Sequence, residues 1–247
     1  MKRLKTASIL PLAACALTLA GCGGVIPAGK APSSGPISSA STANNTSRAA
    51  LPPISRAAPA PRRVASRSGD ISCLAELNAA GAQFNPLPDT YAAPGCNKLG
   101  TVQLSALAGD DGSFGISNVG PLKCSTANTF SSWVRFGVDR AARQILGSPL
   151  KRVETMGSYA CRNVAGTERR SAHARAEAID VSAFVLEDGR RIVLKSDWDG
   201  GTAAEREFLR VVHKSACKRF GTVLGPAYNQ AHADHFHLEG TGAKFCR

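Results

Sequence analysis

Charge is segregated along this chain, and the segregation limits which part of it can fold. All 18 acidic residues lie at Asp70 or later, whereas residues 1–69 carry nine Lys or Arg and no acid. Residues 23–69 are rich in Ala, Pro and Ser and show no apolar periodicity. Such a segment cannot bury enough surface to offset the entropy cost of ordering it. We therefore expect one folded domain over residues 70–247.

The charge distribution also bears on nucleic-acid binding. The formal net charge is +12, but residues 70–247 carry 21 basic residues against 18 acidic ones. A nucleic-acid-binding domain carries its basic excess on the fold itself, so we expect no nucleic-acid partner. The basic segment is either a solvated linker or a tether that its charge holds against anionic lipid or polymer.

The N-terminus has the pattern of an export signal. Lys2, Arg3 and Lys5 precede an apolar run over residues 7–20, which is too short to span a membrane. The run ends in Leu-Ala-Gly-Cys at residues 19–22, which resembles a bacterial lipobox. The resemblance implies a signal peptide over residues 1–21, lipid on Cys22 and a tether over residues 22–69. An ordinary secretory signal cut elsewhere is the alternative.

The expected location is therefore the cell envelope, because acyl chains on Cys22 would anchor the protein in a membrane. Gly23, rather than Asp, follows Cys22, as in lipoproteins that are sent to the outer membrane. We expect the domain to face the periplasm. That compartment is oxidising, so an even set of cysteines there predicts disulfides.

Six cysteines remain after Cys15 and Cys22 are set aside, and the sequence does not choose among their pairings. A zinc–thiolate cluster is the alternative, but no C-x2-C pair is present. The six are Cys73, Cys96, Cys124, Cys161, Cys217 and Cys246.

Hydrophobic periodicity predicts an α+β domain with a small antiparallel sheet that is flanked by helices. We predict helices over residues 72–80, 126–146 and 203–220. We predict a loop over residues 85–95. We predict strands over residues 101–104, 151–162, 178–185, 191–194, 222–225 and 236–238.

Three of the five histidines fall within His232-Ala-Asp-His-Phe-His237. A second polar stretch places His173 seven residues before Asp180. Two imidazoles and one carboxylate leave a fourth position open for water, which is typical of a catalytic zinc. We therefore predict that His173, Asp180 and His237 bind one zinc ion. His235 lies two residues before His237 on a strand, so it points into the same pocket.

These stretches resemble the group of zinc D-alanyl-D-alanine peptidases, lysostaphin-type endopeptidases and hedgehog proteins. The group's pattern is S-x-H-x-x-G-x-A-x-D, followed by an acid and H-x-H. This chain has Ala176 where the pattern has glycine. Across residues 70–247 the chain more closely resembles the bacterial extensin-like C-terminal family, on the runs Gly-Ser-Tyr-Ala-Cys-Arg, Ala-Ile-Asp-Val-Ser, Phe-Gly-Thr-Val-Leu-Gly-Pro and His-Ala-Asp-His-Phe-His.

The resemblance implies roles for further residues. Asp234 would be the general base, and His235 and Arg162 would be catalytic groups that steady an oxyanion or orient substrate. Tyr159, Ser171 and Arg162 would contact substrate. A surface histidine cluster without metal is the alternative for the whole set. His232 is either an outer partner of the ligands or a solvated loop residue, and we expect His213 not to be a ligand.

Two functions follow as hypotheses. The first is a zinc metallopeptidase that hydrolyses stem peptides or cross-links of peptidoglycan, its expected partner. The second is a zinc-containing wall-binding or structural module without turnover. Asp234 favours the enzyme, because a binding module needs no base there.

Overall fold

The computed structural model describes residues 68–247. The predicted signal peptide, the predicted lipid site at Cys22 and the predicted tether up to residue 67 lie outside the described residues. Ser68 and Gly69, which the predicted tether included, are the first residues of a helix, α1 (Ser68–Ala79). Among the described residues, no helix is both long and apolar enough to cross a membrane.

The domain is α+β, as predicted, but its sheet is larger than the sequence indicated and is not purely antiparallel. Ten strands form one sheet, with the central order β1-β4-β5-β7-β8-β11-β10-β12. β5 pairs with β7 in parallel, as β10 does with β12. The strands are β1 (Gln83–Pro86), β2 (Thr90–Ala93), β3 (Cys96–Lys98), β4 (Thr101–Ala108), β5 (Ser113–Ser117), β6 (Leu122–Lys123), β7 (Leu150–Gly157), β8 (Ala178–Leu186), β9 (Arg191–Val193), β10 (Thr222–Leu224), β11 (Phe236–Glu239) and β12 (Phe245–Cys246).

The predicted loop over residues 85–95 was wrong in part. The end of β1 and all of β2 lie there, and β2 and β3 form a separate two-stranded hairpin. The predicted strand over residues 151–162 ends early, at Gly157, whose φ is +108°. An L side chain rarely adopts that φ, so the glycine lets the chain leave the sheet there.

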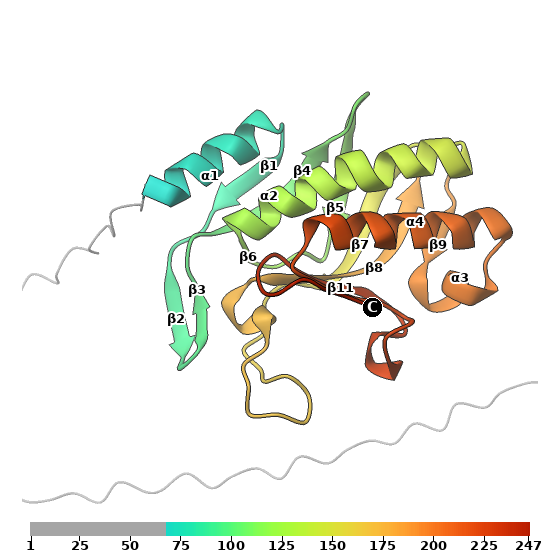
Figure 1. The fold of residues 1–247 in the computed structure, drawn as a ribbon. Coiled ribbons are helices and arrows are strands. Elements are labelled where there is room, and N and C mark those ends of the chain that lie inside the picture. The colour runs from blue at the N-terminus through green and yellow to red at the C-terminus, as the bar shows by residue number, and fades with distance from the viewer. Residues whose placement is uncertain (1–67) are drawn as a thin grey trace, which may run out of the picture. The chain divides into compact units, whose positions relative to one another are not determined.

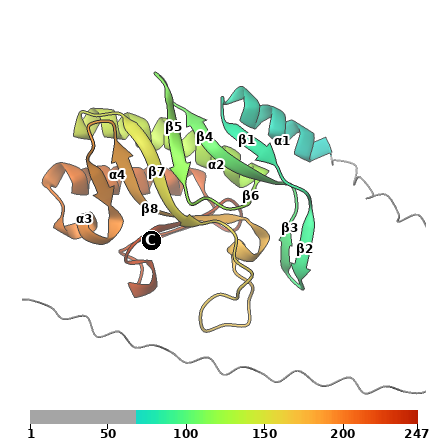
Figure 2. The same cartoon turned by 180° about the vertical axis from the view of Figure 1, so that it is seen from behind.

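Helices cover one face of the sheet. α2 (Cys124–Trp133) continues through two π-helical segments, η1 (Val134–Asp139) and η2 (Ala142–Leu146), and ends at Gly147 in the left-handed conformation. α4 (Ala203–Arg219) lies beside it, and its first turn has a capping box of Thr202 and Glu205. Figure 1 shows both helices in front of the sheet, and Figure 2 shows the strands from behind. A short helix that we did not predict, α3 (Leu194–Gly200), follows β9.

The core lies between this helical layer and the sheet. Trp133 is fully buried, and its ring packs edge-on against Phe184 of β8 and Phe220 beyond α4. Its indole N–H donates to the carbonyl of Val212, 3.1 Å away, so the polar atom of this large side chain is satisfied. Trp133 thus holds α2 and α4 onto the strand that carries Asp180.

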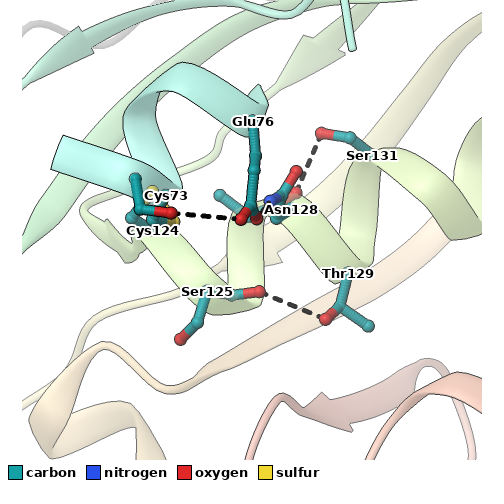
Figure 3. Close-up of a disulfide and its surroundings, with 9 residues drawn as sticks. Cys73, Glu76, Cys124, Ser125, Asn128, Thr129 and Ser131 are labelled. Carbon is teal, nitrogen blue, oxygen red and sulfur yellow. Dashed lines mark hydrogen bonds between the residues drawn. A yellow bond between two sulfur atoms is a disulfide. The ribbon is translucent and has the colours of Figure 1, made fainter. Parts of the chain in front are cut away.

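All six predicted disulfide cysteines are paired, and the structure gives the pairing: Cys73–Cys124, Cys96–Cys161 and Cys217–Cys246. The first joins α1 to the start of α2 (Figure 3). Beside it, the side-chain amide of Asn128 donates to Glu76 at 2.8 Å. The other two hold segments next to the candidate site.

Candidate metal centre

Two neighbouring strands supply two of the three candidate ligands. β8 and β11 are antiparallel, and their register places Asp180 directly across from His237. Ile179 and Val181 on either side of Asp180 are fully buried in the core. Because side chains alternate along a strand, Asp180 must point to the opposite face of the sheet. Its Oδ1 lies 2.9 Å from His237 Nδ1.

The third candidate ligand, His173, lies on a one-turn 3₁₀ helix, η3 (Ala172–Arg175). The Ser171 hydroxyl caps its start by accepting the His173 backbone N–H. Ala176 ends it in the left-handed conformation, at φ +54°. This turn directs His173 toward the sheet, and only 3% of the residue is exposed.

The donor atoms of His173, Asp180 and His237 converge. His173 Nε2 lies 3.1 Å from His237 Nδ1 and 3.2 Å from Asp180 Oδ2. Ligands of a tetrahedral zinc, each about 2.0–2.2 Å from the ion, lie about 3.3 Å from one another. The three side chains therefore fit one zinc ion, with a fourth position left for another ligand.

Outer partners fix which nitrogen of each ring faces this cluster. His173 Nδ1 lies 3.1 Å from the Ser158 carbonyl, and a carbonyl can only accept, so Nδ1 carries the proton. His237 Nε2 lies 2.9 Å from Glu239 Oε1 and donates to that carboxylate. In its neutral form, each ring would thus turn a lone pair toward the cluster, which is how outer partners orient metal-binding histidines.

Glu239 was not among the predicted site residues. It follows His237 by two positions on β11, so it shares a face of the sheet with that residue. That alternation was the signal in the sequence that would have found it. Burial would raise the pKa of Glu239, but the hydrogen bond and charge of His237, together with Thr222 and Arg169, outweigh burial and lower the pKa overall.

The electrostatics of the cluster favour ion pairing. Burial alone would raise the pKa of Asp180, but hydrogen bonds from His173 and His237 outweigh it and hold this pKa well below its usual value. Burial would likewise lower the pKa of His237, but its bonds to Asp180 and Glu239 raise it to about 9. Without a metal, both nitrogens of the His237 ring are therefore protonated at neutral pH.

Asp234 and His235 border the cluster. His235 Nδ1 lies 2.8 Å from Asp234 Oδ1, and its Nε2 lies 3.7 Å from Asp180 Oδ1. The His235 side chain is 11% exposed, whereas that of Asp234 is 42% exposed. His232 packs against both His235 and His237, and burial together with their charges lowers its pKa to about 4. Asp234 is thus open to solvent and is connected to the three donors through the His235 ring.

The three predicted substrate contacts lie in different environments. Arg162 is exposed, and its charge acts on His232. The Tyr159 hydroxyl is buried without a hydrogen-bond partner among the described residues. Ser171 is buried and used as the cap of η3. Only Arg162 therefore presents its functional group at the surface.

A second grouping of potential ligands, His213 with Cys217 and Cys246, does not form a metal site in this state. The two sulfur atoms are bonded to each other. His213 packs against Trp198 and Phe236, and its Nε2 contacts the Arg247 oxygen at 3.1 Å.

Comparison with known proteins places this chain in a family. No curated protein and no solved structure matches the chain. The family described as "Extensin-like protein C-terminus" matches residues 71–247, which include every described element from the first turn of α1 to β12. The chain therefore belongs to the extensin-like protein C-terminal family.

Proposed function

We propose that this protein is a zinc-dependent peptidase of the cell envelope that hydrolyses stem peptides or cross-links of peptidoglycan. The observation that carries the proposal is the convergence of three donor atoms from His173, Asp180 and His237, with both ring tautomers fixed from outside. Three protein ligands with an open fourth position are the pattern of a catalytic zinc site rather than a structural one.

The bordering residues supply the remaining chemistry. When bound, zinc acts as a Lewis acid that polarises a carbonyl oxygen and acidifies water. Asp234, open to solvent beside the donors, accepts the proton of the attacking water and returns it to the leaving amine. Its bond to His235 Nδ1 orients the carboxylate. The exposed guanidinium of Arg162 binds the negative charge that develops on the carbonyl oxygen.

The substrate class is supported by the sequence features outside the site. The signal-like N-terminus with Cys22 would anchor the protein in the envelope, and a basic tether would let the domain reach the wall. Three disulfides suit an oxidising compartment. The sequence resemblance to zinc peptidases that act on peptidoglycan points to the same polymer.

A zinc-containing wall-binding module is the second candidate. The observation that favours it is the 2.8 Å bond between Asp234 and His235, which occupies one oxygen of the carboxylate that the enzyme needs as a base. The two candidates differ in whether covalent bonds in peptidoglycan are broken.

The test is release of soluble muropeptides from purified peptidoglycan by the full-length protein, followed by mass spectrometry. We expect products that a chelator abolishes and added zinc restores, and their masses identify the bond. Asp234→Ala should reduce the rate at least a hundredfold with zinc still bound. Asp199→Ala, at an exposed acid on α3, is the matched control and should not change the rate. Bound zinc without any products would support the binding module instead.

A further inference from the structure

An aromatic row begins beside the candidate metal centre and runs out to the surface. We define the row as His232, Tyr228 and Phe245. The ring centres of His232 and His237 are 5.8 Å apart, those of Tyr228 and His232 are 5.5 Å apart, and those of Tyr228 and Phe245 are 5.8 Å apart. Tyr228 is 42% exposed and Phe245 is 43% exposed. The row is therefore continuous with the site and open to a ligand.

Backbone bonds hold the exposed rings in place. The backbone N–H of Phe245 donates to Gly221, and β12 pairs with β10. The next residue, Cys246, is bonded to Cys217 of α4. On the other segment, the Tyr228 N–H donates to Gly225 at 2.9 Å. A ligand that stacks on these rings would meet a surface that needs little further ordering.

The composition around the row indicates what it binds. The two segments that carry it, residues 225–235 and 240–247, contain no Leu, Ile, Val or Met. Amide side chains accompany the rings instead, at the exposed Asn229 and Gln230. The faces of aromatic rings are electronegative and attract weakly positive C–H groups, while the amides bind hydroxyl groups. A sugar ring offers a C–H face with hydroxyls around its rim.

The size of the row agrees with such a ligand. An aromatic side chain has roughly 150–250 Å² of surface, so the exposed parts of Tyr228 and Phe245 amount to on the order of 200 Å². A stable protein interface needs about 800 Å² on each partner. The row is therefore too small to hold a second protein by itself and suits one or two sugar rings.

We infer that the aromatic row binds the glycan strand of peptidoglycan, next to the centre where an attached peptide is cut. This inference rests on the proposed function and adds the saccharide part of the substrate to it. Arg247, whose guanidinium lies 5.8 Å from the Phe245 ring centre, adds a hydrogen-bond donor at the outer end of the row. Sugar stacked on the row would place an attached peptide within reach of His237.

The experiment measures binding of the zinc-loaded full-length protein to soluble, peptide-free glycan strands of alternating N-acetylglucosamine and N-acetylmuramic acid. Tyr228→Ala and Phe245→Ala should each weaken binding about tenfold. Tyr228→Phe keeps the ring and should stay within about threefold of the wild type. Phe136→Ala is the matched control, because Phe136 is also 43% exposed but belongs to η1.

Three results would overturn the inference. In the first, the wild type does not bind glycan strands. In the second, the Tyr228→Ala and Phe136→Ala variants bind them equally well, and in the third, light scattering shows a wild-type dimer that the Tyr228→Ala variant no longer forms. Zinc content and thermal unfolding show whether each variant is folded. Hydrolysis of sugar-free stem peptides by the wild type is measured in parallel. If the wild type hydrolyses these peptides but binds no glycan, the proposed peptidase activity remains supported and only the saccharide site is refuted.

Discussion

At the scale of single residues, two carboxylates share the His237 ring. Asp180 contacts Nδ1 at 2.9 Å, and Glu239 contacts Nε2 at 2.9 Å. Only the Asp180 side faces the other donors, so Glu239 is the group that keeps the proton on Nε2 when Nδ1 gives up its proton to bind a metal. Glu239 is therefore a positioning residue for the metal centre.

We predict that Glu239→Ala weakens zinc binding 10- to 100-fold, because the ring loses the partner that fixes its tautomer. Glu239→Gln, whose amide oxygen can still accept from Nε2, should lie between the wild type and Glu239→Ala. Competition with a chromogenic chelator measures both. Glu207→Gln, at an exposed glutamate on α4, is the control. If Glu239→Ala binds zinc as tightly as this control, the assignment is wrong.

The protonation of the His237 ring should make zinc binding depend on pH. The pKa of His237 is raised to about 9 in the metal-free protein, so at pH 7 zinc must displace its proton. Zinc affinity should therefore rise with pH up to about 9 and fall as the solution becomes more acidic. Calorimetric titration at pH 7 in two buffers of different ionisation enthalpy should give at least one proton released per zinc. Binding without proton release would contradict the assigned pKa.

At the scale of elements, Ala176 is a strained end to η3. It is fully buried and has φ +54°, a conformation that costs an L residue about 1–2 kcal/mol. A glycine at this position would avoid the cost. The turn still forms here, because the Ala176 N–H bonds to His173 and its carbonyl accepts from Lys123.

We predict that Ala176→Gly changes the free energy of unfolding by no more than about 1 kcal/mol, since relief of strain offsets the loss of a buried methyl worth about 0.8 kcal/mol. Ala176→Val should cost at least about 2 kcal/mol, because a branched side chain is worse in this conformation and must be buried. Urea unfolding measures both. Equal stability of the two variants would show that φ at residue 176 is not under strain.

Elements with a long apolar stripe could be predicted from the sequence. The helix over residues 203–220 was predicted within one residue, and the strand over 178–185 likewise. The three prolines of residues 85–95 hid two short strands, because such strands leave little periodicity to detect. The size of the sheet was also missed. Parallel pairing of β5 with β7 joins segments separated by a long helix, and no local pattern encodes it.

The candidate site, like the fold, could be predicted from the sequence only in part. The spacing of His173, Asp180 and His237 indicated a common centre, because histidines are few and the two stretches are distinctive. Glu239 was missed, since a glutamate two residues after a histidine is an ordinary surface pattern. The buried cap role of Ser171 also needed the three-dimensional turn, because only there does the hydroxyl meet the His173 N–H.

At the scale of the whole molecule, a disulfide holds the loop that leads to His173 against the β2–β3 hairpin. Cys96–Cys161 spans 65 residues and joins β3 to the segment between β7 and η3. Nearby, Arg170 donates to the Pro94 carbonyl and to Asn163. The hairpin β2–β3 is thereby fixed against the loop that precedes His173.

We predict that replacing Cys96 and Cys161 together by Ala lowers the free energy of unfolding by about 4 kcal/mol, from the chain entropy of a loop this long. That corresponds to a fall of roughly 10 °C in the midpoint of thermal unfolding. Zinc binding should weaken as well, because the segment leading to His173 is released. A midpoint that shifts by less than about 2 °C would show that the hydrogen bonds of Arg170 suffice.

The central claim is that His173, Asp180 and His237 together bind one zinc ion. X-ray absorption at the zinc edge, combined with metal analysis of the full-length protein, tests it most directly. We expect one zinc per chain, with nitrogen and oxygen neighbours at about 2.0–2.2 Å and no sulfur neighbour. His173→Ala should lose the metal. A protein without zinc, or zinc bound to sulfur at about 2.3 Å, would contradict the account.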